Sequence, residues 1–151
     1  MTSEVSAIVD ELVSAFSGMA KPPSVELSTI SNEDADEITN HMLRYVDDVK
    51  NFYIPKLLVL TLCAEIATSR RLQWADRLVN LLDVGVEKSA DYIDALLKDV
   101  QRETFSAYSP VQCRAIHHWL EYVRRHFDCS AFMLEIDSAL EFWRNRANST
   151  A

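Results

Sequence analysis

The sequence predicts an all-α protein, with one domain over residues 1–151 folded as a bundle of six or seven helices. Apolar residues recur at helical spacing along nearly the whole chain, and no stretch alternates with the period of two typical of a half-buried strand. The 151 residues include only two glycines and four prolines, too few for a fold built from many hairpins. Apolar residues make up 48% and charged residues 25%, which is the balance of a globular domain.

The first predicted element is a helix over about residues 3–16, with Val5, Ile8 and Leu12 on its apolar face. An irregular connection follows, because the next segment contains Pro22-Pro23 and several serines. We therefore expect residues 1–31 to form an N-terminal helix and its linker, and residues 32–147 to form the main bundle.

The second helix is predicted to begin near Ser31, which forms the pattern of a capping box with Asp34. The third is predicted over about residues 55–68, because Pro55 suits a first helical position and the residues from Leu57 to Ala64 are apolar nearly all round. A helix of that composition is typically central and buried, so we expect the core to surround it.

Four further helices are predicted, over about residues 72–82, 89–101, 110–127 and 130–146. We expect Leu96, Leu97 and Val100 to face inward from the second of these four. The third has the clearest start, since Ser109-Pro110-Val111-Gln112 supplies an N-cap serine, a first-turn proline and a capping glutamine.

The net charge of −8 is concentrated in the first third of the chain. Residues 1–48 hold ten acids and two bases, whereas residues 49–151 hold thirteen of each. Such a field repels nucleic acid and anionic membranes and attracts basic proteins. We therefore expect a basic protein partner and a partner-binding surface made of acidic residues, namely Glu26, Glu33, Asp34, Asp36, Glu37, Asp47 and Asp48.

Much of this acidity also has a structural explanation, which is an alternative to partner binding. Glu33, Asp34, Asp36 and Glu37 lie at the start of the second predicted helix, where the helix dipole favours negative charge. The same side chains could therefore serve helix capping and solubility alone.

The motifs of common catalytic and cofactor sites are absent from the sequence. No glycine-rich phosphate loop and no GxSxG elbow occurs, and we expect no cofactor and no catalytic residue. His117 and Glu121 lie four residues apart on one helix and are weak candidates for metal ligands. Cys113 follows a helix N-terminus but belongs to the apolar stripe, which predicts a core residue rather than a nucleophile.

Cysteine usage and the first residues of the chain indicate a cytoplasmic protein. The three cysteines have no CxxC spacing, which favours free thiols. The first twenty residues carry acids and no early lysine or arginine, so we expect no secretory signal, and no apolar run approaches the length of a membrane span.

Three segments of the chain together form a family pattern: Phe52-Tyr53-Ile54-Pro55, Phe105-Ser106-Ala107-Tyr108-Ser109-Pro110-Val111-Gln112, and Ala139-Leu140-Glu141-Phe142-Trp143. With them, residues 35–147 resemble a bacterial family of small helical domains of unknown function, whose members read roughly F-x-x-Y-L-P-A, F-x-x-L-T-P-x-Q-R and A-L-x-x-Y-W. The chain departs from this pattern at Lys56, which replaces a small residue, and at Cys113, which replaces an arginine. The resemblance implies a helical fold and no known activity.

Three hypotheses of function follow. The first is a non-catalytic protein-protein interaction module with an acidic surface, one version of which is an immunity protein that neutralises a bacterial toxin. The second is an enzyme, acting on a small molecule or dependent on a metal, whose site is assembled from scattered polar residues. The third is a structural or regulatory homo-oligomer, such as a homodimer in which residues 1–31 exchange between subunits.

Overall fold

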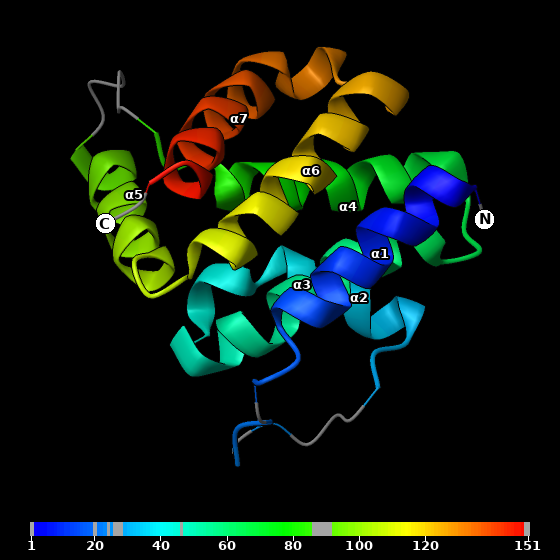
Figure 1. Cartoon of the computed structure of the whole chain (residues 1–151), viewed down its shortest axis with the longest axis horizontal. Helices are drawn as coiled ribbons and strands as arrows, with labels where there is room; N and C mark the ends of the chain where they lie inside the picture. Colours follow the sequence, from blue (N-terminus) through cyan, green and yellow to red (C-terminus); the bar gives the residue numbers. More distant parts are fainter. Residues whose placement is uncertain are drawn as a thin grey trace. The chain divides into compact units, whose positions relative to one another are not determined.

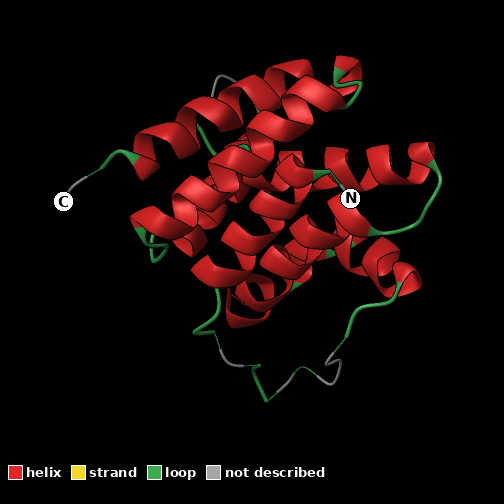
Figure 2. Ribbon diagram, turned by 45° about the vertical axis from the view of Figure 1, so that its right-hand side comes forward, coloured by secondary structure: helices red, strands yellow, loops and turns green. Residues whose placement is uncertain are grey.

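A computed structural model describes residues 2–19, 21–23, 25, 29–45, 47–85 and 92–149. Within these ranges it contains seven α-helices and no strand (Figure 2), which confirms the predicted fold class and helix number. The helices are α1 (Ser3–Ala15), α2 (Asn32–Asn40), α3 (Asp47–Cys63), α4 (Thr68–Leu82), α5 (Tyr92–Phe105), α6 (Pro110–His126) and α7 (Met133–Ala147), with short 3₁₀ helices η1 (Met42–Arg44) and η2 (Ser130–Phe132). No helix in the described ranges is long and apolar enough to cross a membrane.

The chain divides into two compact units, Met1–Leu78 and Val79–Ala151, and the division falls within α4. That residues 1–151 form one domain stays a prediction.

In the first unit, α1 packs against α3 (Figure 1). Thr2 caps α1, since its hydroxyl accepts a hydrogen bond from the Val5 amide at 3.2 Å. The buried residues of α1 are Val5, Ile8 and Leu12, as the apolar spacing predicts. The N-terminal helix therefore packs on its own unit.

The helix α3 differs from its prediction in both its limits and its burial. It begins at Asp47 rather than Pro55 and ends at Cys63, so residues 64–67 are not helical. Two acids in the first turn suit the helix dipole, and residues 49–54 are almost all buried, so packing outweighs the hydrogen bond that Pro55 cannot donate inside the helix. The helix is also not enclosed all round, because Lys56 and Cys63 are exposed.

In the second unit, α6 and α7 form a helical hairpin whose two helices lie side by side along their length (Figure 1). The predicted capping box at the start of α6 is confirmed, because Ser109 and Gln112 exchange hydrogen bonds between side chain and backbone at 3.2 and 2.9 Å. Trp119, Phe132 and Trp143 are fully buried and form the centre of this unit's core.

The prediction for α5 is wrong about which face is inward. Leu96, Leu97 and Val100 are 45%, 41% and 54% exposed, whereas Gln101 is buried. The polar side chains of α5 face the end of α4 because the carbonyl groups there lack helical partners. Gln101 donates to the Leu81 carbonyl at 3.1 Å, Lys98 to the Asp83 carbonyl at 3.1 Å, and Arg102 to the carbonyls of Val84 and Gly85 at 2.6 and 3.1 Å. The polar face of α5 is therefore the buried one, because its side chains donate the hydrogen bonds that these backbone carbonyls need.

Candidate functional site

Among the acidic residues predicted to bind a partner, Asp36 is part-exposed and bound to side chains of α4. Its carboxylate accepts two hydrogen bonds from the Arg70 guanidinium, at 3.1 and 2.5 Å, and one from the Trp74 indole at 2.6 Å. These hydrogen bonds from Arg70 and Trp74 hold the pKa of Asp36 below its usual value. Asp36 therefore joins α2 to α4 and has a structural role, and its predicted place on a binding surface stays a prediction.

A second contact strengthens this junction between α2 and α4. Arg77 donates to the backbone carbonyl of Asp36 at 3.0 Å and to the Thr39 hydroxyl at 3.1 Å. The buried side chains of Ala35 and Ile38 complete the packing of α2. The helix is thus held by charge-assisted hydrogen bonds as well as by apolar contact.

Asp34 also has an internal role, because it forms the predicted capping box with Ser31 at 3.0 and 3.1 Å. Glu33 and Glu37 differ, since both are exposed and neither forms an ion pair with another residue in the described ranges. They lie one turn apart, with Asp36 anchoring the turn between them. The helix therefore presents these two carboxylates to solvent from a fixed backbone.

Asp47 and Asp48 occupy the exposed first turn of α3, which lies to the left of α2 in Figure 1. Asp47 pairs with Lys50 at 3.6 Å, and a carboxylate oxygen of Asp48 accepts from the Val49 amide at 2.9 Å. Glu26, the remaining predicted surface acid, lies outside the described residues. The structure thus separates the exposed acids into a pair on α2 and a pair on α3.

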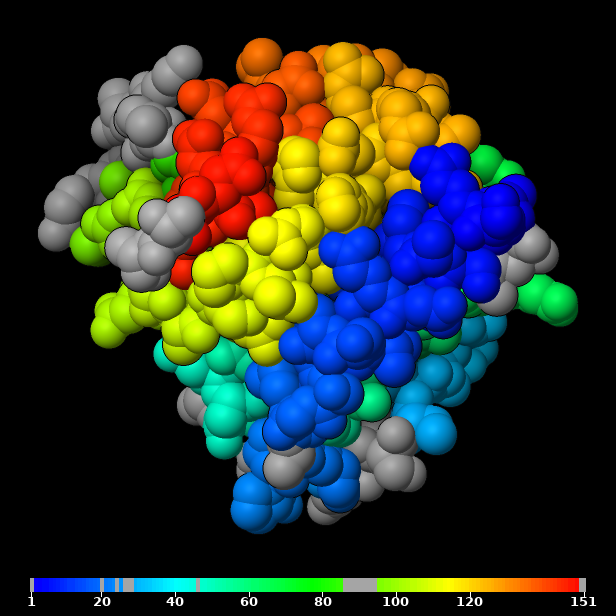
Figure 3. Space-filling view, in the orientation of Figure 1, coloured from blue at the N-terminus to red at the C-terminus, as the bar shows by residue number. Residues whose placement is uncertain are grey.

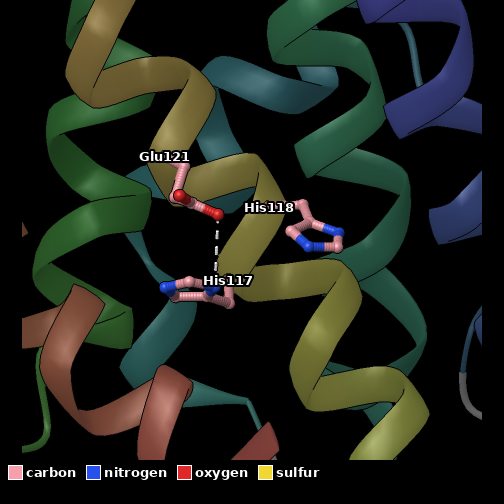
Figure 4. A group of neighbouring side chains, drawn as sticks. All are labelled: His117, His118 and Glu121. Atoms are coloured by element: carbon pink, nitrogen blue, oxygen red, sulfur yellow. Dashed lines mark ion pairs between the residues drawn. The ribbon is translucent and has the colours of Figure 1, made fainter.

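The weak metal candidates His117 and Glu121 do come together on α6, and His118 joins them. The Nδ1 atom of His117 lies 3.3 Å from a Glu121 carboxylate oxygen, and the donor atoms of all three side chains lie within 4.8 Å of one another. Figure 4 shows His117 and Glu121 turned toward each other, with His118 beside them on the same helix. Burial lowers the pKa of His117, so its ring is neutral at neutral pH, the form that a metal binds.

Sequence reasoning missed His118 because it considered only the four-residue spacing. On a helix a residue has neighbours both three and four positions earlier, so Glu121 faces both histidines. Two imidazoles and a carboxylate are ligands of open zinc sites, where water completes the coordination. The positive charge of Arg144, close enough to lower the pKa of His117, opposes a bound cation.

A pocket in the first unit is the feature that the sequence predictions missed entirely. It has a volume of about 460 Å³ and lies between the end of α1, the segment before α2 and the middle of α3. Its walls are mostly apolar, with Phe16, Phe52 and Leu60 among them, and Lys56 is the charged residue in its lining. The only sequence signal was that Lys56 stands where the resembled family has a small residue.

The cysteine considered as a nucleophile is enclosed. Cys113 is 1% exposed, and burial raises the pKa of its thiol, so the reactive thiolate is disfavoured. Its position agrees with the predicted core role.

Comparisons of the chain with protein-family models, with curated proteins and with solved structures find no match. The resemblance to a bacterial family of unknown function therefore stays a prediction, and the function is argued from the residues alone.

Proposed function

We propose that this protein is a non-catalytic, cytoplasmic binding module that recognises a basic protein through exposed carboxylates of its first unit. The observation that carries the proposal is the pair formed by Glu33 and Glu37 on a helix that Asp36 fixes to α4. Asp47 and Asp48 on α3 are a second exposed acidic pair in the same unit.

A fixed backbone favours binding because less conformational freedom is lost when the partner docks. The contacts of Asp36 with Arg70 and Trp74 hold the turn between the two glutamates before any partner arrives. Exposed charges of one sign also accelerate encounter with a partner of opposite sign. Both effects suit an inhibitor-like protein, and neutralisation of a basic toxin is the specific version that we propose.

The test is capture of a partner from the native cells by the tagged chain, beside variants that each remove two negative charges. Glu33→Gln/Glu37→Gln removes the pair on α2, and Asp47→Asn/Asp48→Asn removes the pair on α3. We expect a basic protein that binds the wild type and binds the α2 variant with a slower association rate at low salt.

A matched control removes two exposed acids elsewhere, in the variant Glu103→Gln/Glu141→Gln. The proposal requires that this control keeps the wild-type association rate. A partner that binds all the variants equally would refute an acidic binding surface, and recovery of the untagged chain itself would favour the homodimer. The toxin version further requires that the captured protein alone arrests growth and that co-expression restores it.

A second function is favoured by one specific observation, the convergence of His117, His118 and Glu121. We propose that these three side chains bind a divalent transition metal such as zinc. Because all three are on α6, the site needs no rearrangement of other helices.

Isothermal titration with zinc at pH 7.5 tests this second function. We expect one ion per chain, and an affinity at least about tenfold weaker in His118→Ala, because a ligand is lost. His41→Ala removes a histidine of the first unit and is the matched control, expected to keep the wild-type affinity. Absence of binding heat with the wild type would exclude the site.

A further inference from the structure

We infer that the pocket of the first unit binds a free amphiphile that has one carboxylate head and an unbranched apolar chain. The proposal is independent of the acidic surface, because it depends on other residues. It commits the pocket to a single chemical class, of which medium-chain fatty acids are the simplest members.

The size and lining of the pocket suit an apolar chain. Its volume of about 460 Å³ falls within the ~300–1,000 Å³ that ligand sites commonly have. Val59 and Leu60 from α3 and Val13 from α1 line it, and none of the three is fully buried, so apolar surface is available to a ligand. Figure 3 shows α1, in dark blue, on the surface of the molecule.

The head group is indicated by the surroundings of Lys56. Its ammonium lies over the ring of Phe52, 4.8 Å from the centroid, and both residues line the pocket. No acidic side chain is among the described lining residues, and Lys56 forms no ion pair within the described ranges. A carboxylate at the mouth would therefore meet a cation that has no anionic partner among the residues that the structure describes.

The other lysines of the described residues make this position distinctive. Lys21 donates to the Val25 carbonyl at 2.7 Å, Lys50 pairs with Asp47, and Lys98 pairs with Asp83. Among the lysines that the structure describes, Lys56 alone is placed against an aromatic ring rather than an oxygen. The arrangement holds a positive charge beside apolar walls, which is the complement of a fatty acid.

The net charge of −8 acts against an anionic ligand, but mainly at long range. At physiological ionic strength, charges more than about 8 Å apart are largely screened, whereas contact with Lys56 is direct. The net charge of the chain therefore does not exclude a carboxylate that contacts Lys56.

Isothermal titration tests the proposal on the full chain with sodium dodecanoate and dodecyltrimethylammonium, each below its micelle concentration, and with dodecanol below its solubility limit. We expect the order dodecanoate, dodecanol, dodecyltrimethylammonium from tightest to weakest. Decanoate and octanoate are expected to bind about fourfold more weakly for each methylene group that leaves the pocket.

Variants at the exposed position 56 separate the head group from the chain without altering the core. Lys56→Met is expected to weaken dodecanoate binding about tenfold and to change dodecanol binding less than about twofold, and Lys56→Arg is expected to retain the wild-type affinity. Arg44→Met is the matched control, because Arg44 is in the same unit but does not line the pocket. It should change neither the dodecanoate affinity nor the dodecanol affinity.

Val59→Trp fills the pocket and is expected to abolish binding of both dodecanoate and dodecanol, with a wild-type circular dichroism spectrum as the check of folding. No binding of any amphiphile by the wild type would overturn the proposal. A dodecanoate affinity in Lys56→Met equal to that of the wild type would overturn the role of the charge, even if the pocket binds the alkyl chain of the ligand. Since Glu33→Gln/Glu37→Gln leaves the pocket lining intact, its dodecanoate affinity should remain that of the wild type.

Discussion

The helices α2 and α5 are both fixed to α4 by polar side chains, but in opposite ways. In the first unit one carboxylate of α2, Asp36, accepts hydrogen bonds from two side chains of α4. In the second unit the side chains of α5 donate, and the backbone at the end of α4 accepts. The comparison shows that polar residues position helices in this protein, so that polarity alone does not indicate an exposed face.

The two junctions also differ in their exposure to solvent. The side chains of Asp36 and Arg70 are 40% and 31% exposed, whereas those of Asp83 and Lys98 are 8% and 20% exposed. A charge that loses its partner can be rehydrated in the first case and hardly at all in the second. The α5 junction should therefore be the more sensitive to removal of a charged residue.

The largest effect is expected for Lys98→Met. This change removes the cation that pairs with the buried Asp83 carboxylate, one of whose oxygens already has no hydrogen-bond partner among the described residues. We expect the free energy of unfolding, from urea titration followed by circular dichroism, to fall by about 3 kcal/mol. Lys56→Met is the matched control, because it removes an exposed lysine, and it should change the free energy of unfolding by less than about 0.5 kcal/mol.

If Lys98→Met were as harmless as Lys56→Met, the polar face of α5 would not hold that helix. The double variant Lys98→Met/Asp83→Leu separates charge from packing. It removes both charges, so most of the lost stability should return.

The next effect is expected for Asp36→Ala, which removes the acceptor that joins α2 to α4. Because the pair is part-exposed, we expect a loss of about 1–2 kcal/mol in the same urea titration. Glu37→Ala, one residue away on the exposed side of α2, should cost less than about 0.5 kcal/mol. Equal costs for the two changes would mean that Asp36 is only a surface acid.

The pH dependence of stability should sharpen the same contrast. Since the folded-state pKa of Asp36 lies below its usual value of 3.8, the unfolded chain binds the proton more readily. The contribution of the Asp36 carboxylate to the free energy of unfolding is therefore fully present well above pH 3.8, and it is lost as the pH falls through the folded-state pKa. Thermal melts of the wild type and Asp36→Asn should differ at pH 6 and converge toward pH 3.

Local signals in the sequence predicted the elements that depend on local chemistry. The capping boxes of Ser31 and Ser109 involve residues three positions apart, so the sequence alone contains both partners. The contact of Asp36 with Arg70 spans 34 residues and that of Gln101 with Leu81 spans 20. No periodicity identifies such partners, and for this reason the sequence alone reveals neither the contacts of Asp36 with α4 nor the inward polar face of α5.

The candidate sites follow the same division. Glu121 and the two histidines are within one helical turn, so the spacing rule could have included His118 had both offsets been considered. The pocket is formed by α1, α3 and the segment before α2, and its lining exists only once these elements meet. Lys56 could be noticed in the sequence, but its position over Phe52 could not be derived from it.

The smallest expected effects come from exchanging polarity between the two faces of α5. Gln101→Leu leaves the Leu81 carbonyl without its donor and should cost about 1 kcal/mol, although it makes the buried face more apolar. Leu97→Gln makes the exposed face more polar and should change the free energy of unfolding by less than about 0.5 kcal/mol. The simple expectation that apolar faces are buried predicts the opposite order. Urea titration of the two variants side by side therefore decides which face of α5 packs on the end of α4. A larger loss of stability in Gln101→Leu than in Leu97→Gln would show that the hydrogen bond from Gln101 to the Leu81 carbonyl outweighs the apolar character of the face.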